Sequence, residues 1–261
     1  PPRSTPKPSS AASDVYKRQY ILFSLFISFQ SNDEIFESAT NDYINGDYNS
    51  AINLYLQIVD SGYESHSLYY NLGNAHYKLN NIAESNYYFE MAKKLSPNDP
   101  DIAINLSFAQ NMRVDKIEIL PISQLEVIRL NVINLFSVNS WKILFLIFIW
   151  LLCISLFLYI YYGEPHKKKL FFNISIGLII FSSLIYWISY EKEIESDKLY
   201  GIIYPKEIEV WSEPNKLSEL KFLLHEGTKV QLLNQAQDWT NIRLENGTTG
   251  WLYTDFIKSI K

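Results

Sequence analysis

Two charge-free apolar runs, Ile143 to Tyr162 and Leu170 to Ser189, constrain this chain more than any other feature. Each has about 20 residues, the length that an α-helix needs to cross roughly 30 Å of hydrocarbon. Backbone amides inside a bilayer must bond to one another, so both runs are predicted to be helices. Trp and Tyr residues at the ends of the runs match the aromatic belts of membrane interfaces. We predict membrane spans over residues 141–162 and 170–190. The alternative is a pair of buried core helices in a soluble protein, which rarely stay charge-free over this length.

The connection between the runs predicts their orientation. Residues 163–169 are too few for anything but an antiparallel hairpin, and they include Lys167, Lys168 and Lys169. Short loops rich in Lys or Arg remain in the cytoplasm. We therefore expect these lysines to determine the topology, and the segments before and after the hairpin to lie together on the other side of the membrane.

Composition and motifs argue against several function classes. The net charge of -5 is unfavourable for a nucleic-acid partner. The single cysteine, Cys153, excludes a disulfide within the chain and is expected to be a small packing residue of the first span. There is no phosphate-binding glycine loop, HExxH, CxxC or GxSxG motif, and the four histidines are scattered. We therefore expect no catalytic residue, metal or cofactor.

The start of the chain is treated separately. Residues 1–19 are rich in Pro, Ser and Ala and are predicted to be disordered; they include SAASDVYKRQ, which resembles a translated adapter sequence and is interpreted as non-native. Residues 20–31 contain an apolar run that is too short to span a membrane and suits the remnant of a signal peptide. The alternative for this run is the start of a buried helix.

A helical repeat is predicted over residues 32–112. When the chain is shifted by 34 residues, Tyr43 falls on Tyr77 and Tyr55 on Phe89. The second copy resembles the tetratricopeptide repeat, with Ser85 at a position where the family prefers alanine; its other pattern residues are Tyr69, Leu72, Gly73, Phe89, Ala92 and Pro97. Small side chains at Gly73 and Ala92 allow two helices to approach closely. After Pro100, the sequence DIAINLSFAQNM predicts a helix that caps the array.

The resemblance implies that partners bind on the concave face, which the first helix of each repeat builds. Two sets of residues, each at spacing i, i+4 and i+7, share one face of such a helix. These candidate partner-binding residues are Phe36, Thr40 and Tyr43 in the first copy, and Tyr70, Asn74 and Tyr77 in the second. The alternative is that they are ordinary half-buried side chains. Residues 113–140 are predicted to form either a linker helix or an amphipathic helix at the membrane surface.

The pattern changes to strands in residues 199–261. EIEVW alternates apolar and polar residues, and Asn246-Gly247 predicts a hairpin turn. On the strand before this turn, Ile242 and Leu244 share a face and are predicted to be core residues. The segment resembles a bacterial SH3-like domain, which implies a small five-stranded barrel. We expect Trp211, Trp239 and Trp251 to line a groove for a peptide or glycan; the alternative is that they belong to the core.

Taken together, the predicted fold class is a multidomain membrane protein with α-helical tetratricopeptide repeats, a two-helix transmembrane hairpin and a small all-β SH3-like barrel. This order, with the VDKIE segment after the repeat, resembles the BatE family of the bacterial aerotolerance (Bat) operon. The resemblance implies an inner-membrane protein with both modules in the periplasm, acting as a scaffold for membrane-anchored von Willebrand factor A-type Bat proteins in oxidative-stress tolerance. The alternative is a cell-wall sensor that binds peptidoglycan through the SH3-like domain.

Overall fold

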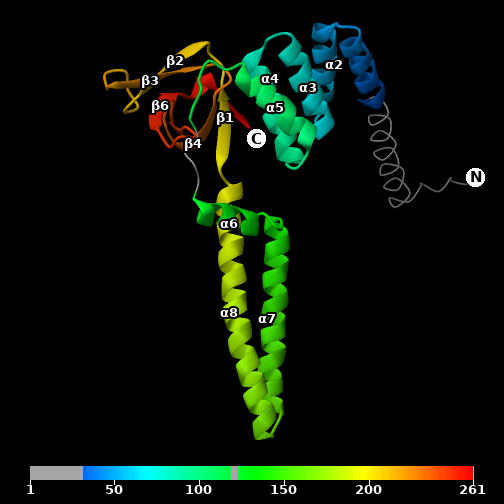
Figure 1. The fold of residues 1–261 in the computed structure, drawn as a ribbon, viewed down its shortest axis with the longest axis vertical. Coiled ribbons are helices and arrows are strands. Elements are labelled where there is room, and N and C mark those ends of the chain that lie inside the picture. Colours follow the sequence, from blue (N-terminus) through cyan, green and yellow to red (C-terminus); the bar gives the residue numbers. More distant parts are fainter. Residues whose placement is uncertain (1–31, 119–122, 261) are drawn as a thin grey trace, which may run out of the picture. The chain divides into compact units, whose positions relative to one another are not determined.

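The computed structural model describes residues 32–118 and 123–260 (Figure 1). The predictions for residues 1–19 and 20–31 therefore concern segments outside the described residues. The chain divides into two compact units. The first combines the segment up to Lys116 with Tyr200–Lys261, and the second is Ile117–Leu199. Each unit is described by itself.

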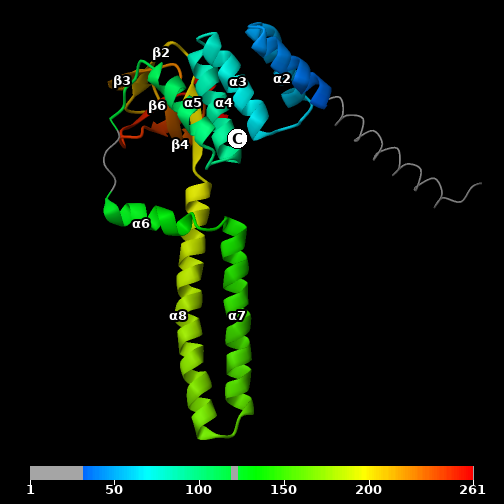
Figure 2. The same cartoon turned by 45° about the vertical axis from the view of Figure 1, so that its right-hand side comes forward.

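The first unit begins with a series of helices, each packed on the next (Figure 2). A helix over residues 32–44 is followed by α2 (Tyr48–Asp60), α3 (His66–Lys78), α4 (Ile82–Leu95) and α5 (Pro100–Asn111). Side-chain oxygens of Asp47, Ser65 and Asp99 accept hydrogen bonds from backbone N–H groups in the first turns of α2, α3 and α5. These caps explain where the helices start, because the first amides of a helix have no partner within it.

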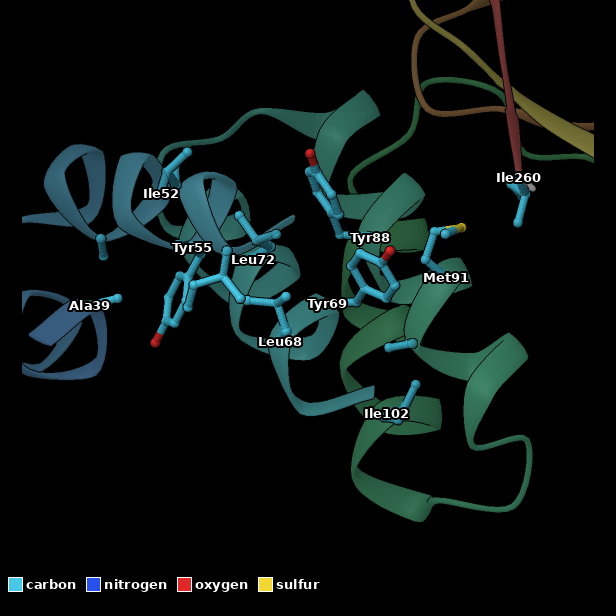
Figure 3. Packing of buried hydrophobic residues seen from close by; sticks show 14 of the residues in the cluster. Ala39, Ile52, Tyr55, Leu68, Tyr69, Leu72, Tyr88, Met91, Ile102 and Ile260 are labelled. Atoms are coloured by element: carbon cyan, nitrogen blue, oxygen red, sulfur yellow. The ribbon is translucent and has the colours of Figure 1, made fainter. Parts of the chain in front are cut away.

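Small residues let α3 and α4 pack closely, as the sequence predicts. A Cβ atom at Gly73 would lie 2.7 Å from the ring of Phe89, and Ala92 is fully buried. Ser85 stands at the position where the family prefers alanine, and its hydroxyl donates to the carbonyl oxygen of Gly73 at 3.0 Å. Around this contact, Leu68 and Leu72 from α3 and Tyr55 from α2 fill the space between the helices (Figure 3).

The C-terminal part of the first unit is a seven-stranded sheet with the strand order β3-β2-β6-β5-β4-β1-β7. The paired strands whose register is defined are antiparallel. The strands are β1 (Leu199–Ile203), β2 (Glu207–Trp211), β3 (Leu220–His225), β4 (Lys229–Ala236), β5 (Trp239–Arg243), β6 (Thr249–Tyr253) and β7 (Ile257–Ile260), with a short 3-10 helix, η1 (Thr254–Phe256), before β7. This is two strands more than the five that the resemblance to an SH3-like domain implies.

The turn between β5 and β6 forms where the sequence predicts it. Gly247 has φ +85°, and its N–H donates to the carbonyl oxygen of Leu244. Asn246 contributes in another way than expected, because its side-chain oxygen accepts from the N–H of Thr248 at 3.0 Å while its φ is not positive. Ile242 and Leu244 are buried, so the prediction that they belong to the core is confirmed.

The second unit consists of α6 (Gln124–Ile133), α7 (Val138–Tyr161) and α8 (Pro165–Ser196). The helices α7 and α8 lie antiparallel along their length (Figures 1 and 2). Both are long and apolar enough to cross a membrane. The predicted loop over residues 163–169 is shorter in the structure, because α8 begins at Pro165 and already contains the three lysines. The charged lysines limit the apolar run, but they do not limit the helix. The helix starts earlier because its backbone hydrogen bonds begin earlier, with the N–H of Lys168 donating to the carbonyl oxygen of Glu164.

The contact between α7 and α8 combines buried serines with an apolar cluster, and large apolar side chains cover its outer surface. The hydroxyls of Ser155 and Ser175 lie 2.9 Å apart and both are buried, as are Ser182 and Ser189. Large apolar side chains such as Trp150 and Ile180 are exposed on the outer surface. Cys153 is also exposed, so its expected role as a packing residue within the described hairpin is wrong. Small residues at a helix contact let the two backbones approach closely, which is how helices associate in lipid.

Helix α6, within the segment predicted as a linker or interfacial helix, is fastened to the end of α8. The guanidinium of Arg129 donates to Glu126 at 2.6 Å and to Glu191 at 2.8 Å. The indole N–H of Trp141, at the start of α7, donates to the carbonyl oxygen of Ile133. Leu125 and Ile128 remain exposed on α6.

We expect the substitution Gly73→Ala to destabilise the α3–α4 contact by about 1 to 3 kcal/mol, because the added methyl group overlaps the Phe89 ring. Amide hydrogen exchange of α3 and α4 in the full chain measures the effect. Gly163→Ala is the control, since a Cβ there meets nothing within 4 Å. Equal protection of α3 and α4 in both variants would show that Gly73 is not required for this packing.

Candidate partner-binding site

The second set of predicted concave-face residues lies on α3 and meets α5. The side-chain N–H of Asn105 donates to the hydroxyl of Tyr70 at 2.5 Å and to the side-chain oxygen of Asn74 at 3.1 Å. Tyr70 and Tyr77 are half-buried and pack against the cluster of Phe89, Leu106 and Ala109. An amide ladder flanked by tyrosines therefore crosses from α3 to α5, with amide groups suited to bonding an extended peptide backbone.

The three residues of the first set contact their own helix and α2. The hydroxyl of Thr40 donates to the carbonyl oxygen of Phe36 and lies 3.0 Å from the hydroxyl of Tyr55. The ring of Phe36 packs against Tyr55, and that of Tyr43 against Tyr48. All three candidates are half-buried. Both sets are thus half-buried and joined by internal hydrogen bonds, and the second set differs in that it continues into exposed apolar side chains on α5.

Three residues of this surface are missing from the sequence-based prediction. Asn105 is one, and the exposed side chains of Ile104 and Phe108 on α5 are the others, at 51% and 52% exposure. The 34-residue period could have found the last two, because it maps Tyr70 onto Ile104 and Asn74 onto Phe108. From the sequence we predict only a capping helix after Pro100 and do not extend the 34-residue period to α5. The structure adds an apolar end to the amide ladder.

Charge on the array is acidic near its start. Asp33, Glu34 and Glu37 are exposed on the helix of residues 32–44. The ladder itself is neutral, since it is built of amide and phenol groups. A partner segment that crosses the helix of residues 32–44, α3 and α5 along the predicted face thus meets the carboxylate of Asp33, then amides, then apolar side chains.

The sheet brings the three candidate tryptophans to one face. Trp211 pairs with Trp251 across β2 and β6, Trp251 pairs with Asn241, and Trp239 pairs with Tyr253 across β5 and β6. Directly opposed residues of antiparallel strands share a face. Trp239 is buried and stacks on Tyr253 with 4.2 Å between ring centroids, whereas Trp211 and Trp251 are half-buried. The side-chain oxygen of Asn241 on this face is buried and has no hydrogen-bond partner.

The lysines predicted to set the topology are exposed at the start of α8. The ammonium of Lys167 pairs with Glu164 at 3.0 Å and lies over the ring of Tyr162. That of Lys168 lies over Tyr159 at 6.0 Å, and Lys169 follows in the same turn. Within the described residues, no group of three or more His, Cys, Asp and Glu side chains is placed to hold a metal ion.

His76 sits behind the concave face, inside the array. Its ring stacks on Tyr88 at 5.4 Å, and its Nδ1 lies 3.2 Å from the amide nitrogen of Asn81. Burial, assisted by the nearby charge of Lys258, lowers the pKa of His76 to about 4. Packing against Tyr88 therefore accounts for this buried histidine.

Comparison with known proteins identifies one part of the chain. Residues 66–99, which cover α3 and α4, match the family model of the tetratricopeptide repeat. Such repeats generally mediate binding to protein partners, so the helical array is suited to a protein-protein interaction. No curated protein matches the chain.

We expect acid to destabilise the repeat through His76. Because the folded chain holds this pKa at about 4, below the ordinary value of 6.5, the unfolded chain takes up the proton first as the pH falls. The free energy of unfolding therefore decreases between about pH 6.5 and pH 4, by up to about 3 kcal/mol. His76→Phe keeps a ring against Tyr88 and removes this dependence, which denaturant unfolding of the helices at several pH values measures.

The control is His66→Phe, at an exposed position at the start of α3. This variant should keep the acid sensitivity of the wild-type chain. An unchanged pH dependence in His76→Phe would mean that other groups carry the effect.

Proposed function

We propose that this protein is a membrane-anchored scaffold that holds a partner protein on the concave face of its tetratricopeptide repeat. The observation that carries the proposal is the amide ladder of Asn74 and Asn105 beside Tyr70, which continues into the exposed side chains of Ile104 and Phe108. An amide side chain can both donate hydrogen bonds to a peptide backbone and accept them from it. Exposed aromatic and branched side chains bind apolar residues.

The partner segment has a defined chemistry in this proposal. It is extended, so that its backbone reaches the amides, and it has an apolar residue for Ile104 and Phe108. Basic residues on it complement the carboxylates of Asp33, Glu34 and Glu37. The protein acts by binding alone, without a catalytic step or cofactor.

The anchor in this proposal is the α7–α8 hairpin. Its outer surface is apolar, whereas a helix pair in water presents a polar outer surface, and serines are buried in the helix contact beside Ile185 and Ile188. Trp150, Ile160 and Ile180 have more than half of their surface exposed. Lipid tails would cover these side chains, and the lysines at the hairpin tip would remain on the cytoplasmic side.

Placement of both modules in one compartment is supported by the way the first unit is built. It combines residues from before and after the hairpin, and Asp115 bonds directly to His225 within it. Segments on opposite sides of a bilayer cannot make such a contact. With the lysines in the cytoplasm, the repeat and the sheet lie in the periplasm of a bacterium with an inner membrane.

The resemblance to the BatE family extends this proposal to particular partners. These are membrane-anchored von Willebrand factor A-type Bat proteins, in an envelope complex for aerotolerance. The VDKIE segment that contributes to the resemblance contains Asp115, which joins the two modules in the structure.

Site-specific photo-crosslinking in native membranes tests the partner site. A photoreactive residue at Phe108 should capture a protein, and Lys93, exposed on α4, is the control position. The substitution Asn74→Ala in the same chain should reduce capture at Phe108 about tenfold, because it removes an amide that bonds the partner backbone. Mass spectrometry should identify a von Willebrand factor A-type protein. Equal capture at both positions would contradict a concave-face site.

The topology is tested with a phosphatase that is active only outside the cytoplasm. We expect activity when it is fused after Lys261 and none when it is inserted between Gly163 and Glu164. The hairpin tip carries the lysines, and the two soluble segments return to the same side. Activity at the tip, or its loss after Lys261, would contradict the proposed orientation.

A second candidate function, binding of cell-wall peptidoglycan, is favoured by the sheet. The pair of Trp211 and Trp251, half-buried on one face of the sheet, offers rings on which a sugar can stack. Sedimentation of the full chain with purified sacculi tests it. Trp251→Ala should weaken saturable binding about tenfold, while Trp187→Ala on the exposed hairpin surface should not. No sedimentation of the unmodified chain would exclude this function.

A further inference from the structure

The turn between β3 and β4 lies against the end of the helical array. Gly227 in this turn has φ +81°, and a Cβ atom there would be 2.7 Å from Ile82 and 3.2 Å from Asn86, both on α4. Thr228 is fully buried. The turn therefore fits against α4 only because glycine has no side chain, and the left-handed backbone also favours glycine.

Asp115 fastens this turn. Its Oδ2 accepts hydrogen bonds from the backbone N–H of His225 and from the hydroxyl of Thr228, both at 2.7 Å. Its Oδ1 lies 2.7 Å from Nδ1 of His225. Both carboxylate oxygens of a residue that follows α5 are thus used by one turn of the sheet. Hydrogen bonds to a charged group are the stronger kind, which suits a single point of attachment.

The imidazole of His225 faces negative charge on two sides. Nδ1 meets Asp115, and Nε2 lies 3.5 Å from the carboxylate of Glu207 on β2. Nearby cations are directed elsewhere: Lys229 pairs with Glu90 on α4 at 2.7 Å, and Arg113 donates to the carbonyl oxygen of Gln110. Glu226 follows His225 in the turn, so acidic groups dominate around the ring.

These contacts favour the charged form of both partners. The hydrogen bond to Asp115 raises the pKa of His225, although partial burial opposes it. Burial alone would raise the pKa of Asp115, but the hydrogen bonds from His225 and Thr228 outweigh it and hold that pKa below its ordinary value. The pair is therefore an ion pair in the acidic to neutral range, and above that range a neutral imidazole donates to the charged carboxylate of Asp115.

We propose that Asp115 and His225 form a proton-dependent latch that holds the sheet on the end of the repeat array. The sheet then serves as a cap, since Ile202 of β1 and Ile260 of β7 are buried in the same cluster as residues of the repeat helices. Ile260 is labelled in Figure 3. Repeat arrays need such a cap to shield their last interface. Protonation of His225 strengthens the latch. Loss of this proton weakens the latch but leaves the other contacts between the turn and the array in place.

The sign of the pH dependence follows from the two groups. The pKa of His225 is raised in the folded chain. Its contribution to the stability of the latch is therefore complete below pH 6.5, its ordinary pKa, and is lost as the pH rises through the higher folded pKa. The contribution of Asp115 to the stability of the latch is complete above pH 3.8, its ordinary pKa, and is lost as the pH falls through its lower folded pKa. The latch is strongest between these limits, in mildly acidic solution.

Amide hydrogen exchange of the full chain tests the latch, because the N–H of His225 itself donates to Asp115. After correction for intrinsic exchange, its protection should fall about tenfold between about pH 6 and about pH 8. His225→Gln should show no such fall. Asp115→Asn should lower protection of residues 225–228 about tenfold or more at both pH values, while α2 and α3 keep theirs. Glu118→Gln, an exposed carboxylate in the same segment, should behave as the wild-type chain.

Two results would overturn the proposal. One is full protection of the His225 amide in Asp115→Asn, and the other is the same pH dependence in His225→Gln as in the wild-type chain. If Asp115→Asn does not fold, Thr228→Val takes its place, since it removes one hydrogen bond and keeps the ion pair. That variant should lose protection a few-fold and retain the pH dependence; a pH-independent Thr228→Val would contradict the latch.

Discussion

The joining of two distant chain segments into one folded unit is the constraint on which the rest of the structure depends. Asp115, after the last repeat helix, contacts His225 and Thr228, and Ile260 of the last strand packs among the helices. The segment between the two parts forms the α7–α8 hairpin, which leaves the first unit near Lys116 and returns to it near Tyr200. A pair of antiparallel helices is the simplest insertion that brings a chain back to its starting side. The fold of the first unit and the hairpin therefore both require the chain before and after the hairpin to lie on the same side.

Within the hairpin, the outer surface is apolar, unlike that of a helix pair in water. Trp150 and Ile180 face outward, while Ser155 and Ser175 are buried in the helix contact. In water this arrangement would expose a large apolar surface at considerable cost, roughly 25 cal/mol for each Å². In hydrocarbon it costs nothing, and the buried hydroxyls find partners in one another and in the carbonyl oxygen of Phe171. Ion pairs of Arg129 with Glu191 and Glu195 hold α6 to α8, and Ile133 adds apolar packing in one cluster with Ile185 and Ile188.

Much of the architecture could be predicted because it rests on local patterns. The 34-residue period located the repeat, Gly73 marked the close helix contact, and Asn246-Gly247 located a hairpin turn. The predicted binding residues were found only in part. Asn74 and Tyr70 of α3 do meet a neighbour on α5, but the sequence pattern did not predict that neighbour, Asn105, or the exposed Ile104 and Phe108. A periodic pattern states which residues share a face of one helix, whereas the pairing of faces depends on how the next helix packs.

The sequence by itself determined the elements whose chemistry is local: apolar runs long enough for a bilayer, helix caps, a repeat with its glycine, and alternating strands. Only the tertiary structure decided that the sheet belongs to the same unit as the helical array, since His225 and Asp115 are 110 residues apart and neither stands in a recognisable motif with the other. It also decided that the three tryptophans share one face with Trp239 buried, and that Lys167 lies within a helix. Contacts between distant residues arise from the packing of whole elements, and a one-dimensional pattern carries no record of which surfaces meet.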